Sequence, residues 1–440
     1  MIEREIDRIV DLTDPSSNRI LNMPVEEARR RVAAGLPEAA ASIDGSFALV
    51  AAAGKKAMLA RSLDRPLRYF LAKQQDGPVL VVSDRIDAIA GWLRREGLAS
   101  QFHPSYTRMV PAHHVLSIEL VGCPDPSPTC ERFFTLAMGT GGTDRDALGA
   151  RYVGALSREI GRWLAAAPAE APIGVCFSGG VDSGAVLLLT YHALGRLGRP
   201  PSRLKAFTLS AGGGADAAQA RAFLAPLGLG MFLEVIDVAP GALDPLEAVR
   251  LIEDYKPLDV ESATMALALC RGIRERYPEW RLLVDGDGGD ENLKDYPIEE
   301  NPELTIKSVV ANPLLYQEGW GVGRLKHSLT YTGGQSRSYT RTYAPLRSCG
   351  FEGFSPYMRP AVIAEAEAIP FARLAAGDVA ALYALKGDLV ARGVKALTGL
   401  AMPVFPKRRF QHGAQDESLV RRRFPHDEAA YREHLLAAYR

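Results

Sequence analysis

Residues 173–184, Ile-Gly-Val-Cys-Phe-Ser-Gly-Gly-Val-Asp-Ser-Gly, decide the fold of this chain. The first five residues alternate apolar side chains with small ones, which predicts a short buried strand. Gly179 and Gly180 have no Cβ, so the backbone there can turn tightly and approach a ligand closely. An apolar run starts at Ala185. The stretch therefore predicts a strand, a tight turn and the start of a helix.

The turn also carries groups that suit a phosphate ligand. Backbone amides at the start of a helix favour a polyanion, and Ser178 and Ser183 add hydroxyl groups. Asp182 would repel phosphates unless a divalent cation lay between its carboxylate and the phosphate oxygens. We therefore expect a nucleotide or pyrophosphate with Mg²⁺. A tight turn with no ligand is the alternative.

Composition limits the classes of protein. The chain has 440 residues, enough for two or three domains, and its 52 basic and 52 acidic residues cancel. Zero net charge offers no electrostatic support for a nucleic-acid partner. The first residues lack the apolar core of a signal peptide, and no apolar run is long enough to span a membrane, so we expect a cytoplasmic protein. The five cysteines are scattered and predict no disulfide framework.

After residue 145, predicted helices and strands alternate. Helices are expected at 146–166 and 215–226, and strands at 204–209 and 231–238. This alternation predicts a doubly wound parallel sheet, which binds ligands at the carboxyl ends of its strands. Leu209 ends a strand beside the first one, where it would pack either on an adenine ring or in the core.

A second polar turn follows the predicted strand at 281–284. Four acidic residues and three glycines occupy residues 285–291, and so many carboxyl groups in one turn are unfavourable unless cations are bound. A calcium-binding loop of the EF-hand type does not fit, because the acids lack that loop's alternating positions. The second turn therefore predicts carboxylates that share a cation with the first.

Together the two turns resemble a known superfamily. Ser-Gly-Gly-Val-Asp-Ser at 178–183 resembles the PP-loop of N-type ATP pyrophosphatases, and residues 285–291 with Tyr296 resemble the second signature of asparagine synthetases. The chain is identified as a member of the asparagine synthetase and β-lactam synthetase superfamily. The resemblance implies that pyrophosphate is held by Ser178, Gly179, Gly180, Ser183 and Gly286. It implies that Asp182 and Asp290 hold Mg²⁺. The implied catalytic residues are Asp287 as base, Tyr255 as its partner and Lys407 as the stabiliser of developing charge.

The chain departs from the family pattern at four places. Asp285 stands where the family has serine, and Asp287 stands where it has glutamate. Lys294 and Asp295 replace a pair of glycines, and Arg359 replaces an acid. Asp285 bears on the nucleotide contacts. Asp287 has a shorter side chain than glutamate, which shortens the reach of the proposed base.

Residues 1–135 are rich in predicted strands. Short phrases at 44–49, 60–69, 82–88 and 110–116 resemble the class II glutamine amidotransferase domain, which has an N-terminal-nucleophile fold. That family uses an N-terminal cysteine, whereas this chain begins Met-Ile and its first cysteine is Cys123. We therefore expect a silent, glutaminase-like domain at 1–135, a linker at 136–150 and an ATP-dependent synthetase domain at 151–440.

The expected reaction is ATP-dependent amide formation, in which a carboxylate is adenylated and the acyl group passes to ammonia or an amine. Closure of a β-lactam or macrolactam within one natural-product substrate is an open alternative. An RNA-modifying PP-loop enzyme, which the zero net charge disfavours, and an ATP-binding pseudoenzyme are further alternatives. We expect small-molecule substrates, with no nucleic-acid or membrane partner, and the sequence leaves a homodimer open.

Overall fold

The computed structural model describes residues 8–74, 77–119, 128–212, 215–295, 298, 304–311, 339–406 and 422–440. The chain forms two compact units. The first is built mainly from Met1–Thr135, and the second from Leu136–Gln317 and Thr340–Tyr431.

The first unit contains two four-stranded sheets. One has the order β1 (Arg8–Asp11), β7 (Gly77–Ser83), β6 (Arg68–Gln74) and β8 (Arg108–Met109). The other has the order β10 (Thr129–Arg132), β9 (His114–Glu119), β5 (Lys56–Arg61) and β4 (Ala48–Ala53). Two short strands, β2 (Arg19–Ile20) and β3 (Gly45–Ser46), pair with each other in a separate two-stranded sheet.

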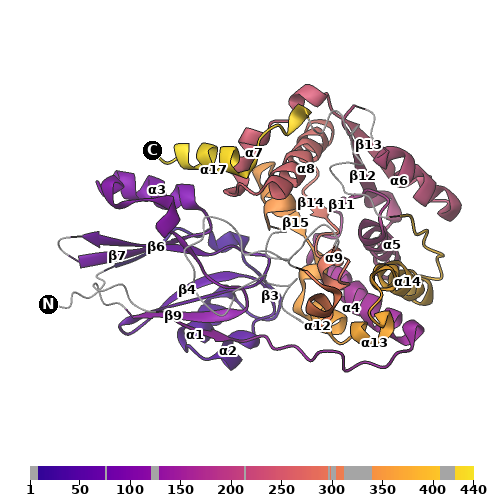
Figure 1. Cartoon of the computed structure of the whole chain (residues 1–440), viewed down its shortest axis with the longest axis horizontal. Coiled ribbons are helices and arrows are strands. Elements are labelled where there is room, and N and C mark those ends of the chain that lie inside the picture. The colour runs from indigo at the N-terminus through magenta and orange to yellow at the C-terminus, as the bar shows by residue number, and fades with distance from the viewer. Residues whose placement is uncertain are drawn as a thin grey trace. The chain divides into compact units, whose positions relative to one another are not determined.

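The two sheets pack face to face. Their shared core includes Leu59 and Leu116 from one sheet and Leu80 and Val82 from the other. Helices α1 (Val25–Ala33) and α2 (Pro37–Ala41) cover the outer face of the β4–β5–β9 sheet. Helix α3 (Ile86–Arg95) covers the outer face of the β6–β7 sheet. The unit therefore has four layers, helix–sheet–sheet–helix (Figure 1).

The second unit is organised around a five-stranded parallel sheet. Its order is β13 (Leu233–Asp237), β12 (Leu204–Ser210), β11 (Ile173–Cys176), β14 (Leu282–Val284) and β15 (Glu352–Phe354). All four strand pairs are parallel. The strand order changes direction at the central strand β11, because the chain adds β12 and β13 on one side and then β14 and β15 on the other.

Helices of the second unit lie on both faces of this sheet (Figure 1). Their bounds are α4 (Arg145–Ala166), α5 (Val181–Arg196), α6 (Asp216–Leu224), α7 (Pro245–Ile252), α8 (Pro257–Arg276), α9 (Gly289–Asn292), α10 (Ile306–Ala311), α11 (Ala344–Ser348), α12 (Pro360–Glu367), α13 (Phe371–Ala375) and α14 (Val379–Thr398). A π-helical turn (Tyr339–Tyr343) precedes α11, and α17 (Glu428–Ala437) lies near the end of the chain.

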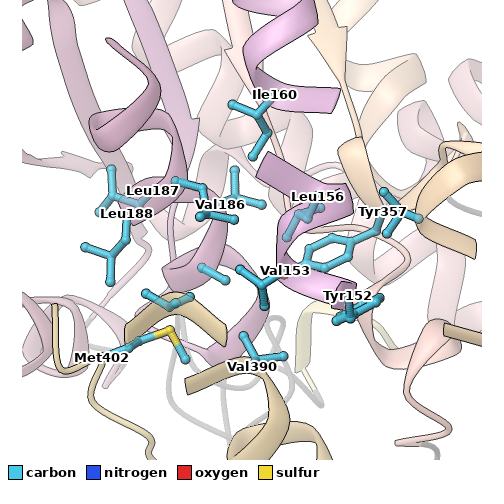
Figure 2. Packing of buried hydrophobic residues seen from close by; sticks show 14 of the residues in the cluster. Tyr152, Val153, Leu156, Ile160, Val186, Leu187, Leu188, Tyr357, Val390 and Met402 are labelled. Carbon is cyan, nitrogen blue, oxygen red and sulfur yellow. The ribbon is translucent and has the colours of Figure 1, made fainter. Parts of the chain in front are cut away.

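Side chains alternate between the two faces along each strand, as expected for strands buried on both sides. Leu282 and Val284 join the cluster that α4, α5 and α14 make on one face, while Leu283 joins the cluster that α8 makes on the other. Figure 2 shows Val153 and Leu156 of α4 in the first of these clusters with side chains of α5 and α14.

Helices α4 and α14 approach each other very closely. A Cβ on Gly149 of α4 would lie 2.4 Å from the Leu389 carbonyl oxygen of α14, and a Cβ on Gly393 would lie 2.3 Å from the Gly149 carbonyl oxygen. Glycine at both positions is therefore required for this crossing. Because the crossing fixes α14, it also fixes the backbone positions from which the side chains on the first half of that helix extend.

The expected α/β class with a parallel sheet is confirmed. The strand expected at 231–238 is shorter, because residues 230–232 form a helical turn first. Of the five cysteines, the four that lie within the described residues are free, and Cys123 lies outside them. No helix in the described part of the chain is long and apolar enough to cross a membrane.

Candidate active site

The two polar turns lie side by side at the carboxyl edge of the parallel sheet. The first follows β11 and the second follows β14, and these strands are direct neighbours with Val175 opposite Val284. This is also where the strand order changes direction. In open parallel sheets, ligands bind in the crevice outside the strand ends at such a point.

The first turn is held by its own hydroxyl groups. Ser183 Oγ accepts a hydrogen bond from the Ser178 amide at 3.2 Å and lies 3.2 Å from Ser178 Oγ. The Gly180 amide donates to Ser178 Oγ at 3.3 Å. Gly179 has a φ of +76°, which explains the need for glycine there. The turn thus presents two serines and the amino end of the 16-residue helix α5 to the crevice.

The second turn packs directly on the first through its glycines. A Cβ on Gly286 would lie 2.9 Å from the Ser183 amide nitrogen, and a Cβ on Gly289 would lie 2.2 Å from Asp182 Oδ1. These glycines leave the room that the Asp182 carboxylate occupies. The structure therefore brings Asp182, Ser183 and Gly286 together.

Lys386 of α14 joins Asp182 to the acids of the second turn. Its ammonium donates to Asp182 Oδ2 at 2.5 Å, donates to Asp290 Oδ1, and lies 3.2 Å from Asp295 Oδ2. The lysine side chain is only 6% exposed. Burial by itself lowers the pKa of Lys386, but the three carboxylates outweigh it and raise that pKa well above its ordinary value.

Two of these carboxylates carry oxygens of the kind that bind a divalent cation, although no three His, Cys, Asp or Glu side chains in the described residues are arranged to hold a metal ion. Asp182 Oδ1 is buried and has no hydrogen-bond partner among the described residues, although Oδ2 is bound to Lys386. Burial raises the pKa of Asp182 to about 7; Lys386 opposes the rise, and repulsion from Asp290 adds to it. Asp182 Oδ1 is thus a carboxylate oxygen without a partner in the described part of the chain, in a group of three acids that share the single ammonium of Lys386. Carboxylate oxygens of this kind are the ligands that Mg²⁺ prefers. Asp182 and Asp290 are the residues that would hold it.

Asp287 lies in the second turn, where one side of its carboxylate is unsatisfied. Its Oδ2 is buried without a hydrogen-bond partner in the described part of the chain, and the Thr342 hydroxyl hydrogen-bonds to the carboxylate. Burial raises the pKa of Asp287 to about 6, although Thr342 and Arg341 oppose the rise. Such a group can accept a proton near neutral pH.

Arg341 lies beside the second turn and joins it to α8. Its guanidinium is 3.3 Å from Asp259 Oδ1 and 3.1 Å from Glu291 Oε1, and both acids are almost fully buried. Buried carboxylates without such a partner would destabilise the fold. Arg341 therefore fixes the segment that places Thr342 against Asp287.

The departures from the family pattern other than Asp287 also have local partners. Asp285 accepts hydrogen bonds from the Asp287 amide at 3.0 Å and from Ser355 Oγ at 2.9 Å, so it braces the turn. Lys294 adopts a φ of +58° and its ammonium donates to Glu367 at 2.6 Å. Asp295 forms an ion pair with Lys386. Arg359 forms an ion pair with Glu159, in which Nε lies 3.5 Å from Oε2.

The other residues named from the sequence lie elsewhere or outside the described residues. Tyr255 lies between α7 and α8 and is partly buried, and within the described residues no hydrogen bond joins its hydroxyl to Asp287. Leu209 is 1% exposed in the cluster on the α8 face of the sheet. Lys407 and Tyr296 lie outside the described residues.

The sequence motifs point to no role for Lys386, Arg341 or Thr342. A signal for Lys386 was present, because it lies four residues after Leu382 and three before Leu389. Helical spacing puts these three side chains on one face, and the two leucines are buried. A lysine within an apolar stripe indicates a buried ion pair or a ligand contact. No comparable pattern marks Arg341 or Thr342.

A doubly wound parallel sheet with a glycine turn and a helix amino end at its switch point is typical of nucleotide-binding α/β domains. Residues 165–395 match the family model described as asparagine synthase, which is more than half of the 440-residue chain. The chain belongs to the asparagine synthase family, whose members are ATP-dependent amide ligases acting on small molecules. A search of curated proteins found no match.

We expect Gly289→Ala to weaken Mg²⁺-dependent nucleotide binding about 100-fold, because the new methyl group would displace the Asp182 carboxylate by roughly an ångström. The change is measured by calorimetric titration of ATP with and without Mg²⁺. Gly195→Ala on α5 is the matched control, since nothing lies within 4 Å of its Cβ position. Equal nucleotide affinity in both variants would contradict the placement of Asp182.

Proposed function

We propose that this protein activates a carboxylate with MgATP as an acyl-adenylate and then transfers the acyl group to ammonia or an amine. In the first half-reaction a carboxylate oxygen bonds to the α-phosphorus and pyrophosphate leaves. In the second, the amine nitrogen bonds to the acyl carbon, AMP leaves and the amine gives up a proton. The observation that carries the proposal is the meeting of Asp182, Asp290 and Lys386 at the strand ends.

The first half-reaction needs positive charge and hydrogen-bond donors around the leaving pyrophosphate. Ser178, Gly179, Gly180 and Ser183 present hydroxyl and amide donors at the start of α5, and Gly286 lets the second turn approach them. Lys386 is a buried cation beside the same turn. When bound, Mg²⁺ would offset negative charge at the phosphorus, and Asp182 and Asp290 would hold it.

The second half-reaction needs a proton acceptor near the acyl group. Asp287 offers a buried carboxylate oxygen without a protein partner in the described residues, three positions before Asp290. Thr342 hydrogen-bonds to this carboxylate, and the positive charge of Arg341 acts on it. We assign Asp287 as the general base. Tyr255 as its partner, Lys407 as a stabiliser of charge and Leu209 as an adenine contact remain part of this proposal.

The first unit is proposed to be a degenerate glutaminase-like domain with an N-terminal-nucleophile fold. Its helix–sheet–sheet–helix layers support this assignment. Cys130 lies on β10 opposite Leu116 of β9, within a strand rather than at a chain end. We place the domain boundary at residue 136, and the linker expected at 136–150 is shorter because α4 begins at Arg145.

Because no reactive terminal thiol is proposed, we expect glutamine to leave the amide yield unchanged and ammonium or an amine to support it. Glutamate release is measured from glutamine with and without ATP. Cys130→Ala serves as a control that should change nothing. Glutamate release that survives removal of contaminating glutaminase would end this part of the proposal.

A pyrophosphate-release assay across a panel of carboxylates tests the overall function. The panel should include single amino acids, amino acids with a second amine that could cyclise, and larger natural-product acids. Release that needs Mg²⁺ and one class of acid supports the ligase and names its substrate class. Specific ATP binding without release for any acid would favour a protein that binds ATP without turning it over.

A further inference from the structure

We propose that Lys386 is an internal counter-ion that holds Asp182 and Asp290 together in the nucleotide-free protein and competes with a divalent cation for their oxygens. The inference rests on the proposed function, because it takes these two acids as the metal ligands. It adds that cation binding and nucleotide binding are coupled through one lysine.

The contacts of Lys386 are those that a metal ion would make. Its ammonium binds Asp182 Oδ2 in the first turn of α5 and Asp290 Oδ1 in α9, which are separated by more than 100 residues of chain. Asp295 supplies a third carboxylate. Divalent cations such as Mg²⁺ take carboxylate oxygens as ligands, and two cations at the same oxygens repel each other strongly in a buried site. The ammonium and the metal therefore compete.

The backbone that carries Lys386 is held in place, so release requires only its flexible side chain. Close packing of Gly149 and Gly393 fixes α14 seven residues further along. A Cβ on Gly387 would lie 2.7 Å from Val404 Cγ1, which leaves little room for the helix to shift there. Lysine has four methylene groups and can move its ammonium without its helix moving.

Nucleotide binding would resolve the competition. Phosphate oxygens at the first turn give the ammonium new anionic partners, so that the carboxylates become available to the cation. We therefore expect a divalent cation to bind weakly alone and tightly with ATP, and ATP to bind tightly only with the cation. This is a reciprocal coupling between two ligands.

The test uses the full chain and Mn²⁺ as the probe, with free Mn²⁺ followed by electron paramagnetic resonance in the absence of nucleotide. We expect Lys386→Met to bind Mn²⁺ at least about tenfold more tightly than the wild type, because the competing charge is gone. Lys386→Arg keeps the charge and should stay weak. Lys395→Met removes a lysine from an exposed position of the same helix and should match the wild type.

Lys386→Met leaves three carboxylates without their ammonium, so its melting temperature should fall without metal and recover with Mn²⁺. The double variant Lys386→Met/Asp295→Asn also removes one of those acidic side chains. It replaces the single variant in the Mn²⁺ titration if the single variant does not fold. If the variants bind Mn²⁺ without nucleotide no more tightly than the wild type, while Mn²⁺–ATP binding still depends on Asp182, the counter-ion inference is wrong and the proposed function stands. Mn²⁺–ATP binding that is indifferent to Asp182→Asn overturns the proposed function itself.

Discussion

Asp182→Asn is expected to reduce Mg²⁺-dependent ATP–pyrophosphate exchange by about 100-fold or more while the protein stays folded. The loss follows because an amide replaces the carboxylate that would hold the metal, and such a metal contributes several kcal/mol to the transition state. The fold should survive, because Lys386 keeps Asp290 and Asp295 as partners. Exchange is measured with a carboxylate found in the pyrophosphate-release panel, and folding by circular dichroism.

Asp388→Asn is the matched control for this variant. Asp388 lies on α14 two residues after Lys386 and pairs with Arg145 and Arg392 at the surface. Surface pairs of this kind contribute little, so exchange should be unchanged. If Asp182→Asn also exchanges at the rate of the wild type, Asp182 is not a metal ligand and the assignment of the site is wrong.

Asp287→Asn is expected to separate the two half-reactions. Exchange between pyrophosphate and ATP should continue, because the first turn, Asp182 and Asp290 are untouched. Amide formation should slow by about 10²–10⁴-fold, the usual loss when a general base is removed. Both are measured on the same preparation, with Thr342→Val as a companion that removes only the hydrogen bond to Asp287. Tyr255→Phe should show a milder form of the same separation.

The pH dependence of amide formation follows from the same residue. A base must be ionised to accept a proton, and burial raises the pKa of Asp287 to about 6. Amide formation should therefore fall as the pH drops through about 6, with bound Mg²⁺ moving this limb to lower pH. Asp287→Asn should lack the limb. Equal loss of exchange and amide formation in that variant would instead place Asp287 in nucleotide binding, and Lys407 would be tested next as the catalytic group.

The parts of the fold that local pattern controls could be predicted from sequence. Alternating apolar side chains in β11 and β12 and the glycine turn after Phe177 predict strands, a turn and a parallel sheet without any tertiary information. The proximity of Asp182 to the second turn could also be predicted, because the carboxyl ends of neighbouring parallel strands lie at one edge of the sheet. The sequence predicts no strand at β6, because its apolar run, Tyr69–Ala72, is only four residues long and lies between polar residues.

The electrostatic partners of the site could not be predicted in the same way. Lys386 reaches Asp182 across 204 residues of sequence because Gly149 and Gly393 allow two helices to touch. Arg341 bridges Asp259 and Glu291 across two further elements. Such contacts depend on helix crossings that local periodicity does not encode. The pKa of Asp287 is another example, because burial raises it more than the neighbouring acids do, and burial of this turn depends on the tertiary fold.

The most direct test of an acyl-adenylate mechanism is to follow oxygen from the carboxylate substrate. The acid found in the release panel is labelled with ¹⁸O in its carboxyl group and incubated with MgATP and the amine, and the products are analysed by mass spectrometry. We expect equal amounts of AMP and pyrophosphate, with one ¹⁸O atom in each AMP and none in pyrophosphate. Formation of ADP and labelled inorganic phosphate would show attack at the γ-phosphorus and would contradict the assigned function.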